Sequence, residues 1–207
     1  MCMFKSMLLL KDKVFCPNYN SHEDMINETG MEHGPMRENF VRVEITPPDD
    51  DLTVPIDKWE YKVDQDYLPE WYVEEVDKPR CFDALKAWAV KHILVGQDVP
   101  GVKQGEFVVL VNCNTGIVKG TVQKVLGGTV QEVRDGGTVQ EVWGGGTVQE
   151  VWGGGTVQEV RVGGTVQEVR VGGTVQKQTG GIVIYADGCI SVCNKNFYRL
   201  ITPEEMK

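Results

Sequence analysis

The chain has 207 residues, enough for one ordinary domain plus an extension. Its formal net charge is −9, and the excess lies in residues 1–100, which hold 20 acidic against 11 basic side chains, whereas residues 101–207 hold 10 of each. An acidic surface repels phosphates, so direct nucleic-acid binding is not expected, and no apolar stretch approaches the roughly 18 residues of a membrane-spanning helix.

Residues 1–98 predict an α+β head domain that also caps the region after it. The hydrophobic pattern predicts strands over residues 4–10 and 14–16, a helix from its N-cap Ser21 to about residue 31, and strands over residues 40–45 and 59–63. A second helix is predicted from Pro79, since proline is favoured at the first helical position, to about residue 94. Its apolar positions share one side: Phe82, Leu85, Trp88, Ala89 and Ile93.

A nine-residue repeat dominates residues 99–181 and predicts their architecture. Six copies of Thr-Val-Gln, each preceded by Gly-Gly, begin at Thr129, Thr138, Thr147, Thr156, Thr165 and Thr174, and an imperfect copy begins at Thr121. Paired glycines would cost a helix about 2 kcal/mol per copy, and valines in strict phase are not typical of a flexible linker. The repeat therefore predicts strands that meet at Gly-Gly corners.

Two strand architectures are compatible with this repeat. In a β-solenoid (a parallel β-helix), two nonapeptides form one coil, valines point inward, and equivalent residues of successive coils stack about 4.8 Å apart. In an antiparallel β-meander, Gly-Gly is a hairpin turn, but strict alternation then leaves neither face of the sheet fully apolar. The pattern favours the solenoid, and the meander is the alternative.

The solenoid predicts columns of similar residues on its outer surface. The sixth position of the repeat, counting the first glycine as one, gives an outer ladder of Glu132, Glu141, Glu150, Glu159 and Glu168, with Lys124 and Lys177 in the flanking copies. Stacked like charges repel by about 1 kcal/mol per pair in water, so they must be solvated or matched by cations. The eighth position carries Arg134, Trp143, Trp152, Arg161 and Arg170. We interpret these residues either as solubilising or as an interaction ridge in which arginine stacks on tryptophan.

The two ends of the chain carry further signals. Residues 182–207 are predicted to form a C-terminal cap, because an uncovered strand edge invites aggregation. Residues 7–10 are too short for the apolar core of a signal peptide, and charged residues follow them directly. The cysteines show no disulfide-scaffold spacing: Cys2, Cys16, Cys81, Cys113, Cys189 and Cys193. We therefore expect a reduced, cytoplasmic protein.

Several segments of the head resemble a family of uncharacterised phage and bacterial proteins. They are the opening Met-Phe-Lys-type strand, Ser21-His22-Glu23, Val41-Arg42-Val43-Glu44, the run from Val63 to Tyr72, and the helix to His92. In that family a small N-terminal domain precedes similar nonapeptide repeats, so the resemblance covers most of the chain. It implies a viral or mobile-element context and no activity. The repeat phrase alone is also similar to repeats in the β-solenoid passenger domains of autotransporters, although the expected secretion signal is lacking.

The potential catalytic and metal-binding residues do not show the spacing of a recognised site. Acidic side chains cluster after the strand at residues 59–63: Asp64, Asp66, Glu70, Glu74 and Glu75. Paired carboxylates can bind a hard cation or transfer protons, but a solvated surface is their commoner role. His22, His33 and His92 lack zinc-ligand spacing, and Cys189 and Cys193 lack a companion pair. No phosphate-binding glycine motif occurs, so we expect no catalytic, cofactor or metal site.

These patterns favour a non-enzymatic repeat scaffold that binds a protein partner or a second copy of itself, with assembly into oligomers or fibres. Two alternatives stay open. One is a phage-encoded inhibitor whose acidic head mimics nucleic acid in the basic cleft of a host protein. The other is an enzyme that uses the region of Asp64 and Asp66. No membrane partner is expected under any of the three.

Overall fold

The computed structural model describes residues 4–31, 39–194 and 197–206. The chain divides into two compact units, Met1–Lys91 and His92–Lys207, so the division stands seven residues before the predicted boundary at residue 98. No helix within the described ranges is both long enough and apolar enough to cross a membrane.

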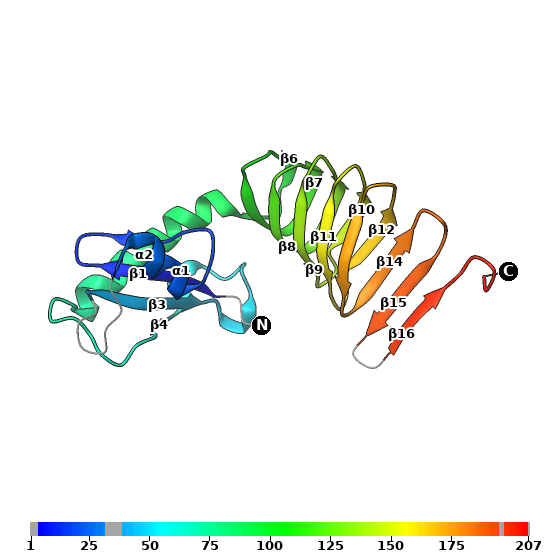
Figure 1. Ribbon diagram of the computed structural model, residues 1–207. Coiled ribbons are helices and arrows are strands. Elements are labelled where there is room, and N and C mark those ends of the chain that lie inside the picture. The colour runs from blue at the N-terminus through cyan, green and yellow to red at the C-terminus, as the bar shows by residue number, and fades with distance from the viewer. Residues whose placement is uncertain (1–3, 32–38, 195–196, 207) are drawn as a thin grey trace. The chain divides into compact units, whose positions relative to one another are not determined.

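The N-terminal unit is a small α+β structure with two helices, as the sequence predicts. Its antiparallel sheet has the strand order β2-β1-β3-β4 (Figure 1). The elements are β1 (Lys5–Leu10), β2 (Val14–Phe15), α1 (His22–Thr29), β3 (Phe40–Thr46), β4 (Glu60–Val63) and α2 (Glu74–His92), with single 3-10 turns at Pro48–Asp50 and Ile56–Lys58 between β3 and β4.

Both faces of this sheet are covered, which explains why β1 is buried along its whole length. On one face, Leu8, Leu10 and Phe40 pack against Met25 and Ile26 of α1. Since side chains alternate along a strand, the neighbouring residues of β1 and β3 face the other way, toward α2. There the ring of Tyr61 on β4 lies 6.3 Å from that of Phe82 on α2. A strand buried on both sides is typically apolar, as β1 is from Met7 to Leu10, whereas its first two residues, Lys5 and Ser6, are polar and buried.

The helix α2 corrects the sequence prediction at both ends. It begins at Glu74 rather than at Pro79, and it ends at His92, after which Ile93 already belongs to a strand. Its start is fixed by Asp77, whose Oδ2 accepts a hydrogen bond from the backbone N–H of Val73 at 2.9 Å. Pro79 therefore lies inside the helix, where its missing N–H deprives the carbonyl four residues earlier of a partner.

The second unit is built from strands. They are β5 (Ile93–Val95), β6 (Asp98–Val102), β7 (Phe107–Val118), β8 (Thr121–Val133), β9 (Thr138–Trp143), β10 (Thr147–Val151), β11 (Thr156–Val160), β12 (Thr165–Val169), β13 (Thr174–Gln178), β14 (Gly181–Tyr185), β15 (Ile190–Asn194) and β16 (Phe197–Ile201). From residue 93 to residue 185 they form a β-solenoid of about five turns, visible in Figure 1 as a stack of strands.

Parallel pairing rules out the meander for this region. Thr147 of β10 pairs with Thr129 of β8 on one side and Thr165 of β12 on the other, so partners lie 18 positions apart. The pairs β9–β11 and β11–β13 have the same spacing and are also parallel. A hairpin meander would have made every one of these pairs antiparallel.

The register separates two faces of the solenoid. The first face contains β5, β9, β11, β13 and the leading halves of β7 and β8. The second face contains β6, β10, β12, β14 and the trailing halves of β7 and β8. Valines from both faces form one continuous core, in which Val130, Val139, Val148 and Val157 are fully buried. Thr115 occupies an inward position opposite Val130, and its buried hydroxyl has no hydrogen-bond partner among the residues that the structure describes.

The predicted C-terminal cap contains an antiparallel extension of the second face. β14 pairs with β15, and β15 pairs with β16. Gln178 stands where the preceding copies have the second valine of the repeat, and its Nε2 donates to the carbonyls of Gly181 at 3.0 Å and Ser191 at 3.2 Å. A hydrogen-bonded amide thus replaces an apolar side chain where the core ends.

Candidate interaction surface

The 18-residue register distributes the predicted glutamate ladder over both faces. Glu132, Glu150 and Glu168 are neighbours on the second face. Glu141 and Glu159 are neighbours on the first face, between Lys124 of β8 and Lys177 of β13. Each glutamate therefore has a like charge one strand away, so each column requires cations between its carboxylates.

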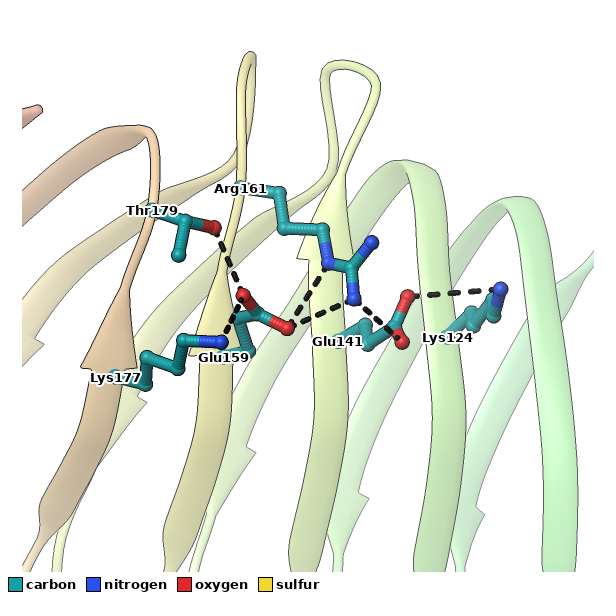
Figure 2. A network of polar contacts seen from close by, with 6 residues as sticks. All are labelled: Lys124, Glu141, Glu159, Arg161, Lys177 and Thr179. Carbon is teal, nitrogen blue, oxygen red and sulfur yellow. Dashed lines mark hydrogen bonds and ion pairs between the residues drawn. The ribbon is translucent and has the colours of Figure 1, made fainter. Parts of the chain in front are cut away.

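Arg161 supplies the central cation of the first face (Figure 2). Its Nη2 lies 3.1 Å from an oxygen of Glu141 and 2.8 Å from an oxygen of Glu159. Lys124 approaches the outer side of Glu141 at 3.5 Å, and Lys177 approaches Glu159 at 3.2 Å. We call this column, from Lys124 to Lys177, the first-face ladder, and its charges alternate in sign along the stack.

Glu159 is the most heavily bonded carboxylate of the first-face ladder. Thr179 Oγ1 donates a hydrogen bond to it at 2.8 Å, in addition to the contacts from Arg161 and Lys177. Desolvation by burial opposes ionisation, but these three donors outweigh it and hold the pKa of Glu159 below its usual value. A lowered pKa means that the carboxylate stabilises the fold above its unfolded-state pKa, and this contribution is lost as the pH falls through the lower, folded-state pKa.

The second-face column is paired in the same way but more openly. Arg170 Nη2 lies 3.0 Å from Glu150 and 2.7 Å from Glu168, while Arg134 Nε lies 2.9 Å from Glu132. The glutamate side chains joined by Arg170 are 31% and 35% exposed, whereas those joined by Arg161 are only 13% and 15% exposed. Arg161 and Arg170 thus occupy the same repeat position and each joins two glutamates, but the glutamates joined by Arg161 are more deeply buried.

Of the two tryptophans in the predicted ridge, Trp152 stacks with an arginine as expected and Trp143 stacks with a lysine instead. Arg134 lies over the ring of Trp152 at 5.3 Å, as the register predicts. The ring of Trp143 receives Lys124 at 5.8 Å, and Arg161 turns to the glutamates. Ion pairing is the stronger attraction, because a carboxylate carries a full charge and an aromatic ring only a quadrupole. The arginines of the ridge are therefore engaged within the chain.

An open groove of about 340 Å³ follows the first-face ladder. Glutamines at the fifth repeat position form its second wall, one strand spacing apart in the stack. The lining residues are Gln140, Glu141, Gln158, Glu159, Gln176 and Lys177. Sequence reasoning singled out the charged wall and missed the glutamine wall and Thr179. The glutamines recur at the fifth position of every copy, and Thr179 stands at the eighth position of the last copy, where the earlier copies have arginine or tryptophan.

The acidic cluster of the N-terminal unit does not assemble into one site. Among the described residues, only Asp64 of its five members joins two other potential metal ligands, and these are His22 and Glu44. Asp66, Glu70 and Glu75 are exposed, and exposed Glu74 lies 3.9 Å from Lys78 of the same helix. His33 and Cys2 lie outside the described residues. His92 contacts the carbonyl oxygen of Phe107 at 2.6 Å.

A buried cation was not found by sequence reasoning. Lys5 on β1 is 3% exposed, and desolvation lowers its pKa to about 8. Its Nζ donates to the carbonyls of Ser6 and Tyr19 and to Oδ1 of Asn20 at 2.9–3.1 Å. With three oxygen acceptors, the ammonium group ties β1 to the segment before α1, which is a structural role.

Comparisons of the chain with protein-family models, curated proteins and solved structures find no significant match.

Arg161 should contribute more to the stability of the fold than the equivalent Arg170. Replacing Arg161 with Ala leaves two largely buried glutamates adjacent and unpaired at their centre, which should lower the free energy of unfolding by about 2–3 kcal/mol. Arg170→Ala is the matched control, because its ion pairs are more exposed and water screens them, so its loss should destabilise the protein clearly less. Urea denaturation of both variants measures the difference. Equal losses for the two variants would contradict the assignment of Arg161 as the central cation.

Proposed function

We propose that this chain is a non-enzymatic scaffold whose repeat region is a stiff rod of 18-residue coils, each made of two nonapeptides, and that it associates with a second copy through its C-terminal end. The observation that supports the proposal most directly is the uneven end of the solenoid. In the described part of the chain, β13 pairs only with β11, so the first face stops there. The second face continues for two more strands, β15 and β16, beyond β14.

The two extra strands present an incompletely covered inner surface. Val183 of β14 is buried and lies opposite Ser191 of β15, which in turn lies opposite Leu200 of β16. Because directly opposed residues share a face of a sheet, Leu200 continues the inward side of the second face. Tyr198, opposite Cys193, lies on the same side. Both side chains are exposed, at 46% and 65%.

The end is complementary to a copy of itself. It offers an edge of β13 that pairs with no other described strand on the first face, and a two-strand projection on the second face. A two-fold axis at this end places the projection of each copy beside the short face of the other, where the free edges of β13 and β16 can pair. The same operation buries Tyr198 and Leu200 between the copies. Such a contact is closed, so it yields a dimer, and fibres require a further contact elsewhere.

Sedimentation velocity over a range of protein concentrations tests the proposal. We expect a monomer–dimer equilibrium that Leu200→Glu shifts toward the monomer, because the substitution places a charge in the contact. Val162→Glu is the matched control, since Val162 is also exposed but lies on a corner of the repeat. A wild-type chain that stays monomeric to about 0.1 mM, equivalent to a binding free energy weaker than about −5.5 kcal/mol, would contradict association through this end.

A further inference from the structure

The N-terminal unit brings together three potential metal ligands that are far apart in the sequence. His22 is the first residue of α1, Glu44 lies on β3, and Asp64 directly follows β4. One ligand atom from each lies within 4.8 Å of the other two. Histidine nitrogen and carboxylate oxygen are the ligand types of divalent transition metals such as zinc. We propose that these residues bind one such ion.

The orientation of the His22 ring supports this assignment. Its Nε2 lies 3.3 Å from the carbonyl oxygen of Val43, and a carbonyl can only accept a hydrogen bond, so in the neutral ring the proton is on Nε2. The Nδ1 atom then carries the lone pair, and it faces Oδ2 of Asp64 at 3.7 Å. Two acceptors that face each other need a proton or a cation between them. A backbone carbonyl that holds the second ring nitrogen is the usual support of a metal-bound histidine.

The backbone positions the three groups on one face of the sheet. Arg42 and Glu44 alternate along β3 with the buried Val43, and Lys62 of β4 is directly opposite Glu44. The N–H of Asp64 donates to the carbonyl of Arg42 at 2.9 Å, which continues the register past the end of β4. The His22 side chain is only 12% exposed, so α1 fixes one ligand, while Asp64, whose side chain is 44% exposed, lies nearer the solvent.

The cluster requires little rearrangement to hold an ion. Ligand atoms bound about 2.1 Å from a metal are about 3–4 Å from one another, so the carboxylates need move by only about 1 Å. Three protein ligands leave positions that water can fill, as in open zinc sites. Lys62 competes with the metal, because its Nζ lies 3.7 Å from Oδ1 of Asp64. The site lies outside the repeat and does not depend on the scaffold role.

Titration of the full, reduced chain with Co²⁺, followed by visible absorption, tests the site. Nitrogen and oxygen coordination gives d–d bands alone, whereas binding by cysteine adds a charge-transfer band in the near ultraviolet. We expect the d–d bands to shift and intensify relative to the free aqueous ion and to saturate at one equivalent. We also expect a loss of affinity of at least about tenfold in Asp64→Asn and in His22→Asn, and tighter binding in Lys62→Gln. Asp66→Asn is the matched control, because this exposed carboxylate lies outside the cluster, and its affinity should be unchanged.

Two results would overturn the site. One is that the wild-type chain at about 1 mM Co²⁺, a concentration equivalent to a binding free energy of about −4 kcal/mol, gives a d–d spectrum that equals the spectrum of the free aqueous ion. The other is unchanged affinity in both Asp64→Asn and His22→Asn. Circular dichroism of each variant without metal shows whether the unit is folded, and Glu44→Gln provides an independent ligand variant if His22→Asn disturbs α1.

Discussion

Val151→Asp should abolish cooperative unfolding of the repeat region. Val151 is fully buried on β10, between Val133 of β8 and Val169 of β12. The carboxylate would enter a core of valines with no cation beside it, at a cost of several kcal/mol. A domain of this size is stable by only about 5–15 kcal/mol in total. Each coil also supports its neighbours in a solenoid, so the damage should spread along the stack.

Hydrogen exchange measured by mass spectrometry can locate the effect of Val151→Asp. We expect loss of amide protection in β8, β10 and β12, while the N-terminal unit keeps its own protection. Val171→Asp is the matched control, because the same substitution falls on a valine that is 95% exposed, and its stability should change by less than about 0.5 kcal/mol. If the two variants unfold at the same temperature, the distinction between inward and outward valines is wrong.

Gly155→Ala is the second substitution with a large expected effect. A Cβ atom at Gly155 would lie 2.0 Å from the carbonyl oxygen of Val133 and 2.5 Å from its carbonyl carbon. Both atoms belong to the backbone of the preceding coil, so they cannot rotate away as a side chain would. Overpacking of this kind costs about 3 kcal/mol, and here it also separates two hydrogen-bonded strands.

Substitution of the neighbouring Gly154 distinguishes the cost of a steric clash from the cost of backbone strain. Gly154 has a φ of +88°, and an added Cβ would meet no atom closer than 3.7 Å. Gly154→Ala should therefore cost only the strain of a left-handed conformation, about 1–2 kcal/mol. Thermal unfolding of both variants should place Gly155→Ala well below Gly154→Ala. The reverse order would mean that the first glycine of the repeat, and not the second, limits the approach of the coils.

Stepping along the repeat in units of nine was sufficient to predict the solenoid and its inward valines. A short exact period makes like residues stack, so the register follows once pairing between equivalent copies is assumed. The same reasoning placed Glu141 beside Glu159 and required that the two carboxylates be either solvated or matched by cations. Parallel pairing was favoured from the apolar pattern, because alternation over a hairpin sheet left no fully apolar face.

Other features were decided by contacts between distant residues. The start of α2 depends on the hydrogen bond from Val73 to Asp77, which outweighs the preference of Pro79 for the first helical position. The partner of Trp143 is Lys124 because Arg161 is drawn to two carboxylates. No local sequence pattern specifies these contacts, because each depends on the relative energies of alternative neighbours.

The sequence by itself determined the repeat, its core and the columns on its surface, because a period acts through neighbours at fixed spacing. Only the tertiary structure decided where the first face ends, how far the second face continues, and which carboxylates meet His22. Residues 22, 44 and 64 have no motif spacing, and they meet because α1 packs on the sheet beside the ends of β3 and β4. Antiparallel pairing and helix packing bring residues together at sequence separations that vary with the length of each loop. The spacing of residues in the sequence therefore does not predict these contacts.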